Sequence, residues 1–218
     1  MVGLFVFMKK LLLRQLLLLI TSCVRNIEYP DTIDYFESDF YSHFPKKINV
    51  GSSGYIVSAS QQISNYHPNV RLVTKFKRDT IKSFVDQIRK KSIGSYKGTD
   101  TCLLVIDKHV TNEFWKVDKT ARRKYEEYNF DYNPCTVNKY PIPKFYGNSY
   151  FDSIDKTSIS GLIEKFEFFI LSAESGIFMD TLKLPNGRFT PKDWKHGYSK
   201  GIAINLESCV IIYWSDIW

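Results

Sequence analysis

The chain has few residues of the types that build metal sites and disulfide frameworks. Its 218 residues include four cysteines and four histidines. No Cys-x-x-Cys or His-x-x-x-His spacing occurs, and the histidines stand far apart in the sequence. The common zinc sites need such closely spaced ligand pairs, so we expect no metal and no cofactor.

The chain also lacks an apolar run long enough to cross a bilayer. A membrane-spanning helix needs about 20 consecutive apolar residues, whereas Lys9, Lys10, Arg14 and Gln15 divide the apolar N-terminus into short pieces. Internal repeats and low-complexity segments are absent, and no shift in composition marks a second domain. We therefore expect one folded domain and no transmembrane helix.

The N-terminus has instead the pattern of an export signal. Three basic residues, Lys9, Lys10 and Arg14, precede the stretch LLLLITSC, in which an apolar run ends in small residues and Cys23. Positive charge first, an apolar core second and small residues last is the order of a signal peptide. Translation from Met8 gives a more regular signal than translation from Met1, and both starts remain open.

The tetrapeptide Ile20-Thr21-Ser22-Cys23 resembles the lipobox of bacterial lipoproteins. The resemblance implies a signal peptide over residues 1–22, removed by a dedicated peptidase, and a mature chain whose first residue, Cys23, is lipidated. It further implies a tether over residues 23–30 and a single domain over residues 31–218. The implied location is the bacterial envelope, at the periplasmic face of the outer membrane, with surface display left open. A buried N-terminal helix with an incidental cysteine is the competing interpretation.

A weaker likeness concerns glycosylation. Four Asp-Ser/Thr-apolar triplets, centred on Thr32, Thr80, Ser153 and Thr181, resemble the O-glycosylation acceptor of exported proteins in Bacteroidetes. The composition, rich in Asn, Lys and Tyr, is compatible with that origin. At two of these positions an Asp followed by Thr equally suits the start of a helix.

The charge is only mildly basic after export. The full chain carries +7, and Lys9, Lys10 and Arg14 supply three of these charges, which leaves +4. Short basic runs such as Lys75–Arg78 and Arg89–Lys91 are usually solvated helix faces. We expect no nucleic-acid partner, and attraction to anionic headgroups or envelope polymers is a secondary hypothesis.

Apolar periodicity predicts two helices in the first half of the chain. Helical spacing of aromatic residues predicts one from Asp31 to Pro45, and a second apolar face predicts one from Asp79 onward. The residues on the two faces are Ile33, Phe36, Phe40 and Phe44, and then Ile81, Phe84, Val85 and Ile88. A third, shorter helix is expected over Ser158–Phe166.

Runs of β-branched and apolar residues predict the strands. They are Tyr55–Ser58, Val70–Thr74, Thr101–Ile106, Phe168–Leu171 and two final runs, Gly201–Leu206 and Cys209–Trp214. The continuous apolar run at Thr101–Ile106 suggests a central strand covered on both faces. The predicted class is α+β: a mixed or antiparallel sheet, two to four helices and a C-terminal β-hairpin.

Three cysteines remain beyond Cys23, an odd number that allows at most one internal disulfide. Cys102 and Cys209 lie in the apolar runs TCLLVID and CVIIYW, where we expect them to act as small buried apolar residues. Cys135 follows Asn133-Pro134 and is expected to be the more exposed cysteine.

One segment matches a catalytic pattern. Gly197-Tyr198-Ser199-Lys200-Gly201, preceded by His196, resembles the nucleophile elbow of α/β-hydrolases. That elbow lies between a strand and a helix, and its histidine follows later in the chain, whereas no histidine follows Ser199 here. The segment is therefore interpreted as a glycine-bounded turn into the last hairpin. A Cys135 nucleophile paired with His109 or His196 is the other enzymatic hypothesis.

Aromatic residues suggest a binding surface. The irregular stretch from Lys108 to Pro143 is rich in tyrosine, and its Tyr125, Tyr128 and Tyr132, together with Trp194, are candidate ligand-binding residues. Exposed rings in irregular segments serve sugar-binding and protein-binding surfaces. Packing of a long loop against the domain is the alternative explanation.

The sequence thus predicts a membrane-anchored envelope lipoprotein with a non-catalytic binding or structural role. Its expected partners are the membrane, through acylated Cys23, and an envelope protein or polysaccharide. Three alternatives remain: an immunity-type lipoprotein that binds a toxin, a carbohydrate-binding surface protein, and a hydrolase that uses Ser199 or Cys135.

Overall fold

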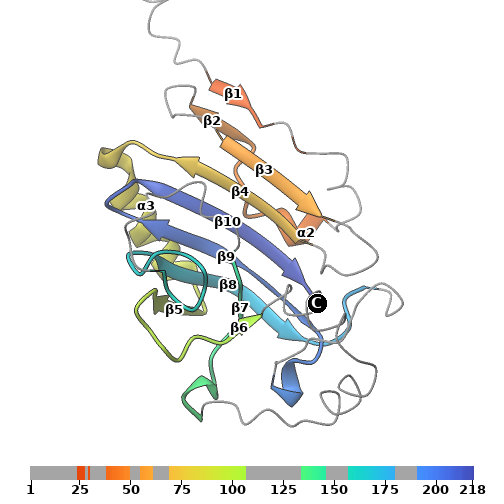
Figure 1. Cartoon of the computed structure of the whole chain (residues 1–218). Coiled ribbons are helices and arrows are strands. Elements are labelled where there is room, and N and C mark those ends of the chain that lie inside the picture. The colour runs from red at the N-terminus through yellow and green to blue at the C-terminus, as the bar shows by residue number, and fades with distance from the viewer. Residues whose placement is uncertain are drawn as a thin grey trace, which may run out of the picture.

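In the computed structural model, strands hold more of the described residues than helices do (Figure 1). The structure describes residues 24–27, 29, 38–49, 55–60, 69–106, 134–145, 157–179 and 191–218. The strands are β1 (Val24–Asn26), β2 (Lys47–Asn49), β3 (Tyr55–Ser60), β4 (Asn69–Lys75), β5 (Gly94–Lys97), β6 (Val105–Ile106), β7 (Ile142–Pro143), β8 (Glu167–Ser175), β9 (Gly197–Asn205) and β10 (Val210–Ile217). The helices are α2 (Ser38–Tyr41) and α3 (Arg78–Lys91), with 3₁₀ turns at Pro134–Thr136 and Lys192–Trp194.

A six-stranded sheet in the order β3-β4-β10-β9-β8-β5 forms the centre of the molecule. All of its neighbouring strands pair antiparallel. Two small pairs, β1-β2 and β6-β7, lie outside it. Helices together with a largely antiparallel sheet make this an α+β protein, as the sequence predicted.

The two last strands are buried along their whole length or nearly so. Every residue of β10 is buried, and β9 is buried from Gly201 to Asn205. They pair from Val210↔Asn205 to Ile217↔Tyr198. The turn between them covers residues 206–209. Asn205 Oδ1 accepts the backbone N–H groups of Glu207 and Ser208, and Cys209 adopts a φ of 55°.

Both faces of the central sheet are covered, which explains the apolar run in β10. On one face, Ile81, Val85 and Ile88 of α3 join Ile27 and Phe44 in a core cluster. On the other face, segments outside the central sheet and the helices pack against the strands. Their buried residues are Leu103, Ile142, Phe145, Leu162, Ile163 and Phe166.

The α3 prediction is confirmed. Three of the four residues on its predicted face, Ile81, Val85 and Ile88, are buried, and Phe84 packs partly buried against Phe76. Because those residues recur at helical spacing, one side of the helix meets the sheet. The strands predicted at Tyr55–Ser58, Val70–Thr74 and Phe168–Leu171 are found as parts of β3, β4 and β8.

The first helix is found only in part. Of Asp31–Pro45, the described residues are helical at Ser38–Tyr41 alone, and residues 31–37 lie outside the described chain. Phe44 is buried and Phe40 packs edge-on against Tyr198, as expected for a core-facing aromatic stripe.

The prediction of a central strand at Thr101–Ile106 was wrong. Only Val105–Ile106 forms a strand, and it pairs parallel with β7 outside the central sheet. Leu103, Leu104 and Ile106 are buried, and Leu103 belongs to the core cluster on one face of the sheet. Residues 94–97, for which no strand was predicted, form edge strand β5. An apolar run indicates that the residues are buried. A segment that packs against the face of a sheet shows the same run as a central strand within the sheet.

The helix expected over Ser158–Phe166 was also wrong. The stretch forms a turn closed by a bridge between Thr157 and Ile163. Gly161 has a φ of +86°, and a Cβ there would lie 2.0 Å from the Phe145 carbonyl oxygen. Only glycine suits that position, and its backbone conformation ends any helix.

Residues 24–27 do not form the expected tether. Val24–Asn26 are strand β1, paired antiparallel with β2, and Ile27 is buried in the core. The Tyr29 hydroxyl donates a hydrogen bond to the Pro45 carbonyl at 2.7 Å. Strand β1 therefore begins at the residue after Cys23, and Cys23 itself lies outside the described residues. Among those residues, no helix has the length and apolar character that crossing a membrane requires.

Candidate functional site

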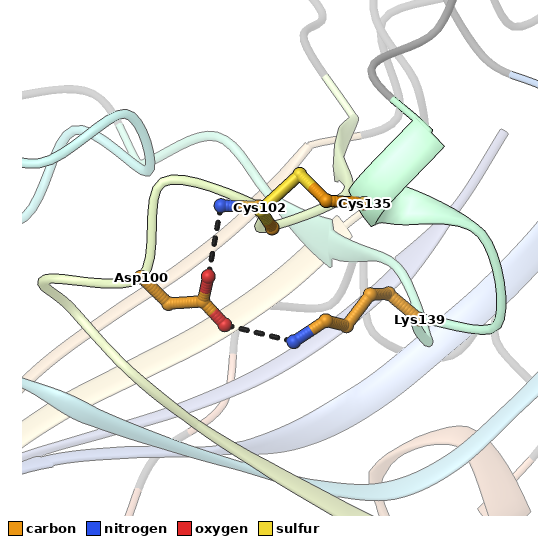
Figure 2. The surroundings of a disulfide bond; sticks show 4 residues. All are labelled: Asp100, Cys102, Cys135 and Lys139. Carbon is orange, nitrogen blue, oxygen red and sulfur yellow. Dashed lines mark hydrogen bonds and ion pairs between the residues drawn. A yellow bond between two sulfur atoms is a disulfide. The ribbon is translucent and has the colours of Figure 1, made fainter.

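A disulfide joins two irregular segments that cover one face of the sheet (Figure 2). It links Cys102 to Cys135, with the two Cα atoms 5.4 Å apart. The expectation that Cys102 is a lone buried apolar residue was therefore wrong. The sequence allowed one disulfide but could not select the pair, because pairing depends on the fold. Of the cysteines in the described chain, Cys209 is free and half-buried.

An ion pair connects the same two segments beside the disulfide. Asp100 Oδ1 accepts the backbone N–H of Cys102 at 2.8 Å, and Asp100 Oδ2 accepts a hydrogen bond from Lys139 Nζ at 2.8 Å (Figure 2). The hydrogen bond from Lys139 lowers the pKa of the Asp100 carboxyl. This carboxylate holds the turn before Cys102 and the chain after Cys135 together.

Tyr96 of β5 attaches the second segment to the edge of the sheet. Its hydroxyl accepts the backbone N–H of Tyr140 at 2.7 Å. Lys139 Nζ lies 4.6 Å from the centre of the Tyr96 ring, within the range of a cation–π contact. Burial raises the pKa of the Tyr96 phenol, so it remains neutral and able to donate.

Strands β6 and β7 complete the junction. Val105 pairs with Ile142 and Ile106 with Pro143 in parallel register. The backbone N–H of Ile142 donates to the Leu104 carbonyl at 2.9 Å, and that of Lys144 to the Ile106 carbonyl at 2.8 Å. We call residues 100–106 and 134–144 the loop base. These residues flank segment 107–133 on both sides, and the disulfide and the β6–β7 pair join them to each other.

Ser199 lies inside β9 and has no access to solvent. Its exposed fraction is 0%. Its Oγ donates to the Pro141 carbonyl at 2.7 Å and accepts a hydrogen bond from Trp214 Nε1 at 3.3 Å. The turn expected at Gly197–Gly201 was wrong, and the strand-to-helix elbow of a hydrolase is absent at Ser199.

The two glycines of that pattern have packing reasons instead. A Cβ at Gly201 would lie 2.4 Å from both the Trp214 indole and the Phe169 carbonyl oxygen. A Cβ at Gly197 would lie 2.7 Å from the Glu174 carbonyl oxygen. Close packing therefore explains both glycines of the pattern. Gly201 leaves room for the Trp214 indole, and Gly197 leaves room for the backbone of β8 at Glu174.

Cys135 and His196 are not placed for the second enzymatic hypothesis. The sulfur of Cys135 is bonded to Cys102, so it is not a free thiolate nucleophile. His196 is half-buried, and its Nδ1 has no hydrogen-bond partner among the described residues. His109 lies outside the described chain.

Trp194 packs against the end of the chain. Its ring lies 6.1 Å from that of Trp218 at 39°, and its carbonyl accepts a hydrogen bond from Trp218 Nε1 at 3.0 Å. Trp218 and Trp214 are buried. The tryptophans of this region therefore do not form the coplanar exposed pair that a sugar platform needs. Tyr125, Tyr128 and Tyr132 lie outside the described residues.

Sequence reasoning missed two polar contacts made to β10, one by His43 and one by Arg71. His43 Nε2 donates to the Trp214 carbonyl at 3.0 Å, and its Nδ1 has no partner among the described residues. Burial lowers the pKa of His43 to about 4. On the other face of the sheet, Arg71 pairs with buried Asp216 at 3.0 Å. An alternation of polar with apolar residues in β4 and β10 is the only signal that could have indicated the second pair.

No cluster of three or more His, Cys, Asp or Glu residues suited to a metal ion occurs within the parts of the chain listed above.

No protein-family model, curated protein or solved structure matches the chain. The loop base is the feature that distinguishes this domain, because a disulfide, an ion pair and a strand pair converge on one junction.

Proposed function

We propose that the chain is a bacterial envelope lipoprotein, acylated on Cys23, whose domain binds an envelope protein or polysaccharide without catalysis. The observation that carries this proposal is the Cys102–Cys135 disulfide. Structural disulfides persist in oxidising compartments such as the bacterial periplasm and are rare in the cytosol. A chain that crosses the inner membrane needs an export signal, and residues 9–23 have the pattern of one.

The start of the fold supports a close attachment to the membrane. Strand β1 begins at Val24, the residue that follows Cys23. One acyl chain binds a bilayer only marginally, whereas two or more hold a protein stably, and bacterial lipoproteins carry several. An acylated Cys23 would therefore keep the domain at the bilayer surface with almost no linker.

The loop base supports a binding role. Binding residues are commonly presented by loops on a rigid scaffold, because fixed ends reduce the entropy lost on binding. Here the disulfide, the Asp100–Lys139 ion pair and the β6–β7 pair fix both ends of segment 107–133. That segment contains Tyr125, Tyr128 and Tyr132, the residues proposed to contact the partner.

Metabolic labelling with an alkyne fatty acid tests the anchor. Wild-type chain and a Cys209→Ala variant should take up the label, and Cys23→Ala should not. Cys209 is the matched control, because it is the other cysteine of the mature chain outside the disulfide. Label on Cys23→Ala, or no label on the wild type, would refute the acylation.

The non-catalytic role has its own test. Purified protein should not hydrolyse esters or envelope polysaccharide, and Ser199→Ala should change only the stability, because Ser199 is buried and hydrogen-bonded. A turnover present in the wild type and abolished in Ser199→Ala would overturn this part of the proposal.

A further inference from the structure

The positive charge of the chain is concentrated in one short segment. Residues 75–91 contain seven lysines and arginines and two aspartates, a net charge of +5. The chain beyond residue 22 carries +4, because three of the total of +7 lie in the signal. Within the chain beyond residue 22, the residues outside 75–91 therefore carry a net charge of 4 − 5 = −1. Such asymmetry produces a local positive potential that attracts anionic surfaces.

Helix α3 directs this charge away from the protein. Ile81, Val85 and Ile88 pack on the sheet. The basic side chains of the segment are all exposed, and we call them the α3 surface: Lys75, Lys77, Arg78, Lys82, Arg89, Lys90 and Lys91.

Within the described chain, few acids neutralise the α3 surface. Arg89 pairs with Glu167 at 3.2 Å and with Asp86 at 3.7 Å. Lys82, Lys90 and Lys91 have no ion pair with any described residue. A lysine with no ionic partner in the described part of the chain is available to an external anion.

Helix α3 also packs on the same face of the sheet as Ile27. Ile27, which follows β1, is buried in the same core cluster as Ile81 and Val85 of α3. Lys46 and Lys47, at the start of β2 beside β1, are exposed and add positive charge there. In Figure 1, α3 lies behind the central sheet.

We propose that the α3 surface docks on the anionic lipid headgroups of the membrane that holds Cys23. The inference rests on the proposed lipid anchor, which keeps the domain within reach of the bilayer. Attraction to an anionic leaflet falls off within a Debye length, about 8 Å at physiological salt. With β1 starting at Val24, the domain lies close enough for this attraction to select the face turned to the membrane, and so to point the opposite face, with the loop base, toward solvent.

Lysine footprinting of the full chain in vesicles tests this inference. The protein is reconstituted in phosphatidylcholine vesicles with or without phosphatidylglycerol, treated with an amine-acetylating reagent and digested for mass spectrometry. We expect Lys82, Lys90 and Lys91 to react several-fold more slowly on the anionic vesicles, and high salt to restore their reactivity. Exposed Lys195 should react equally on both.

Charge-reversed variants provide the matched control. Lys90→Glu with Lys91→Glu should abolish the protection of Lys82, whereas Lys97→Glu with Lys195→Glu, the same change in charge at exposed positions outside α3, should preserve it. Equal reactivity of Lys82 on both vesicles in the wild type would overturn the inference, as would equal loss of protection in both variants.

Acylation of Cys23 is measured on the same digests, so the two proposals fail separately. An acylated chain without protection of the α3 lysines retains the anchor and overturns the docking. A chain without acyl groups whose α3 lysines are protected when vesicles are added overturns the anchor and retains the docking.

Discussion

Gly201 is the residue that allows Trp214 to lie flat across β9. A Cβ at this position would meet both the indole and the Phe169 carbonyl at 2.4 Å. The indole itself is buried and donates to Ser199 Oγ. Neither neighbour can move without a large energetic cost, because the Trp214 ring is packed in the core and the Phe169 carbonyl belongs to the backbone of β8.

We therefore expect Gly201→Ala to lower the free energy of unfolding by at least about 2 kcal/mol, as overpacking of a buried core does. Urea denaturation followed by tryptophan fluorescence measures the change. Ser175→Ala, at an exposed position near the end of β8, should cost no more than about 0.5 kcal/mol. Equal stability of Gly201→Ala and wild type would contradict the packing described for Trp214.

His43 makes stability depend on pH. Burial holds its folded pKa at about 4, against 6.5 for an unperturbed histidine. As pH falls from 6.5 to 4, the unfolded chain binds a proton that the folded chain does not. The free energy of unfolding therefore falls across this window, by a total of about 3 kcal/mol at 1.4 kcal/mol per pH unit.

The variant His43→Gln tests this coupling. Relative to wild type, it should lose about 3 kcal/mol less stability between pH 6.5 and pH 4, measured by denaturation at several pH values. The pKa of Asp100 lies below its ordinary value of 3.8, so its protonation affects stability only at lower pH, and it does so equally in both proteins. Parallel curves for the two proteins across the window would contradict the burial of a neutral imidazole.

At the scale of elements, the disulfide and its neighbours hold the loop base together. The Cys102–Cys135 bond spans a sequence separation of 33. A cross-link of that span stabilises a folded chain by roughly 3–4 kcal/mol, mainly by restricting the unfolded state. The β6–β7 pair contains only two residues per strand and depends on this closure.

Replacing both cysteines by serine should therefore cost roughly 3–4 kcal/mol of stability. It should also speed amide hydrogen exchange at Ile142 and Lys144, whose N–H groups bond across the loop base. Amides in the middle of β9, such as that of Ile202, should change less, beyond the global loss. Unchanged exchange at Ile142 and Lys144 would show that the disulfide is not what closes the base.

The elements that the sequence predicted are those whose periodicity arises from one packed face. Helix α3 has apolar residues at helical spacing because only one side meets the sheet. Strand β5, with the polar sequence GSYK, lacks such a signal and was missed. The helix expected at Ser158–Phe166 failed because Gly161 fits a close approach to Phe145, a contact distant in sequence. The Cys102–Cys135 pair and His43 were unpredictable for the same reason, since their partners are fixed only by the fold.

At the scale of the whole molecule, three features bear on orientation: the proposed acyl anchor at Cys23, the basic segment 75–91 and the loop base. Strand β1 starts at Val24, residues 75–91 carry a net charge of +5, and the loop base covers the other face of the sheet from α3. A domain held by its first residue and turned by charge would expose the loop base to the compartment it faces. Both the attachment to the membrane and this orientation depend on acylation of Cys23.

The mass of the N-terminal peptide of the protein, purified from its native membranes, tests that dependence most directly. The account predicts a peptide that begins at Cys23 and carries the added mass of several acyl chains. A peptide that retains residues upstream of Cys23, or an unmodified Cys23 in protein recovered from the soluble fraction, would contradict it.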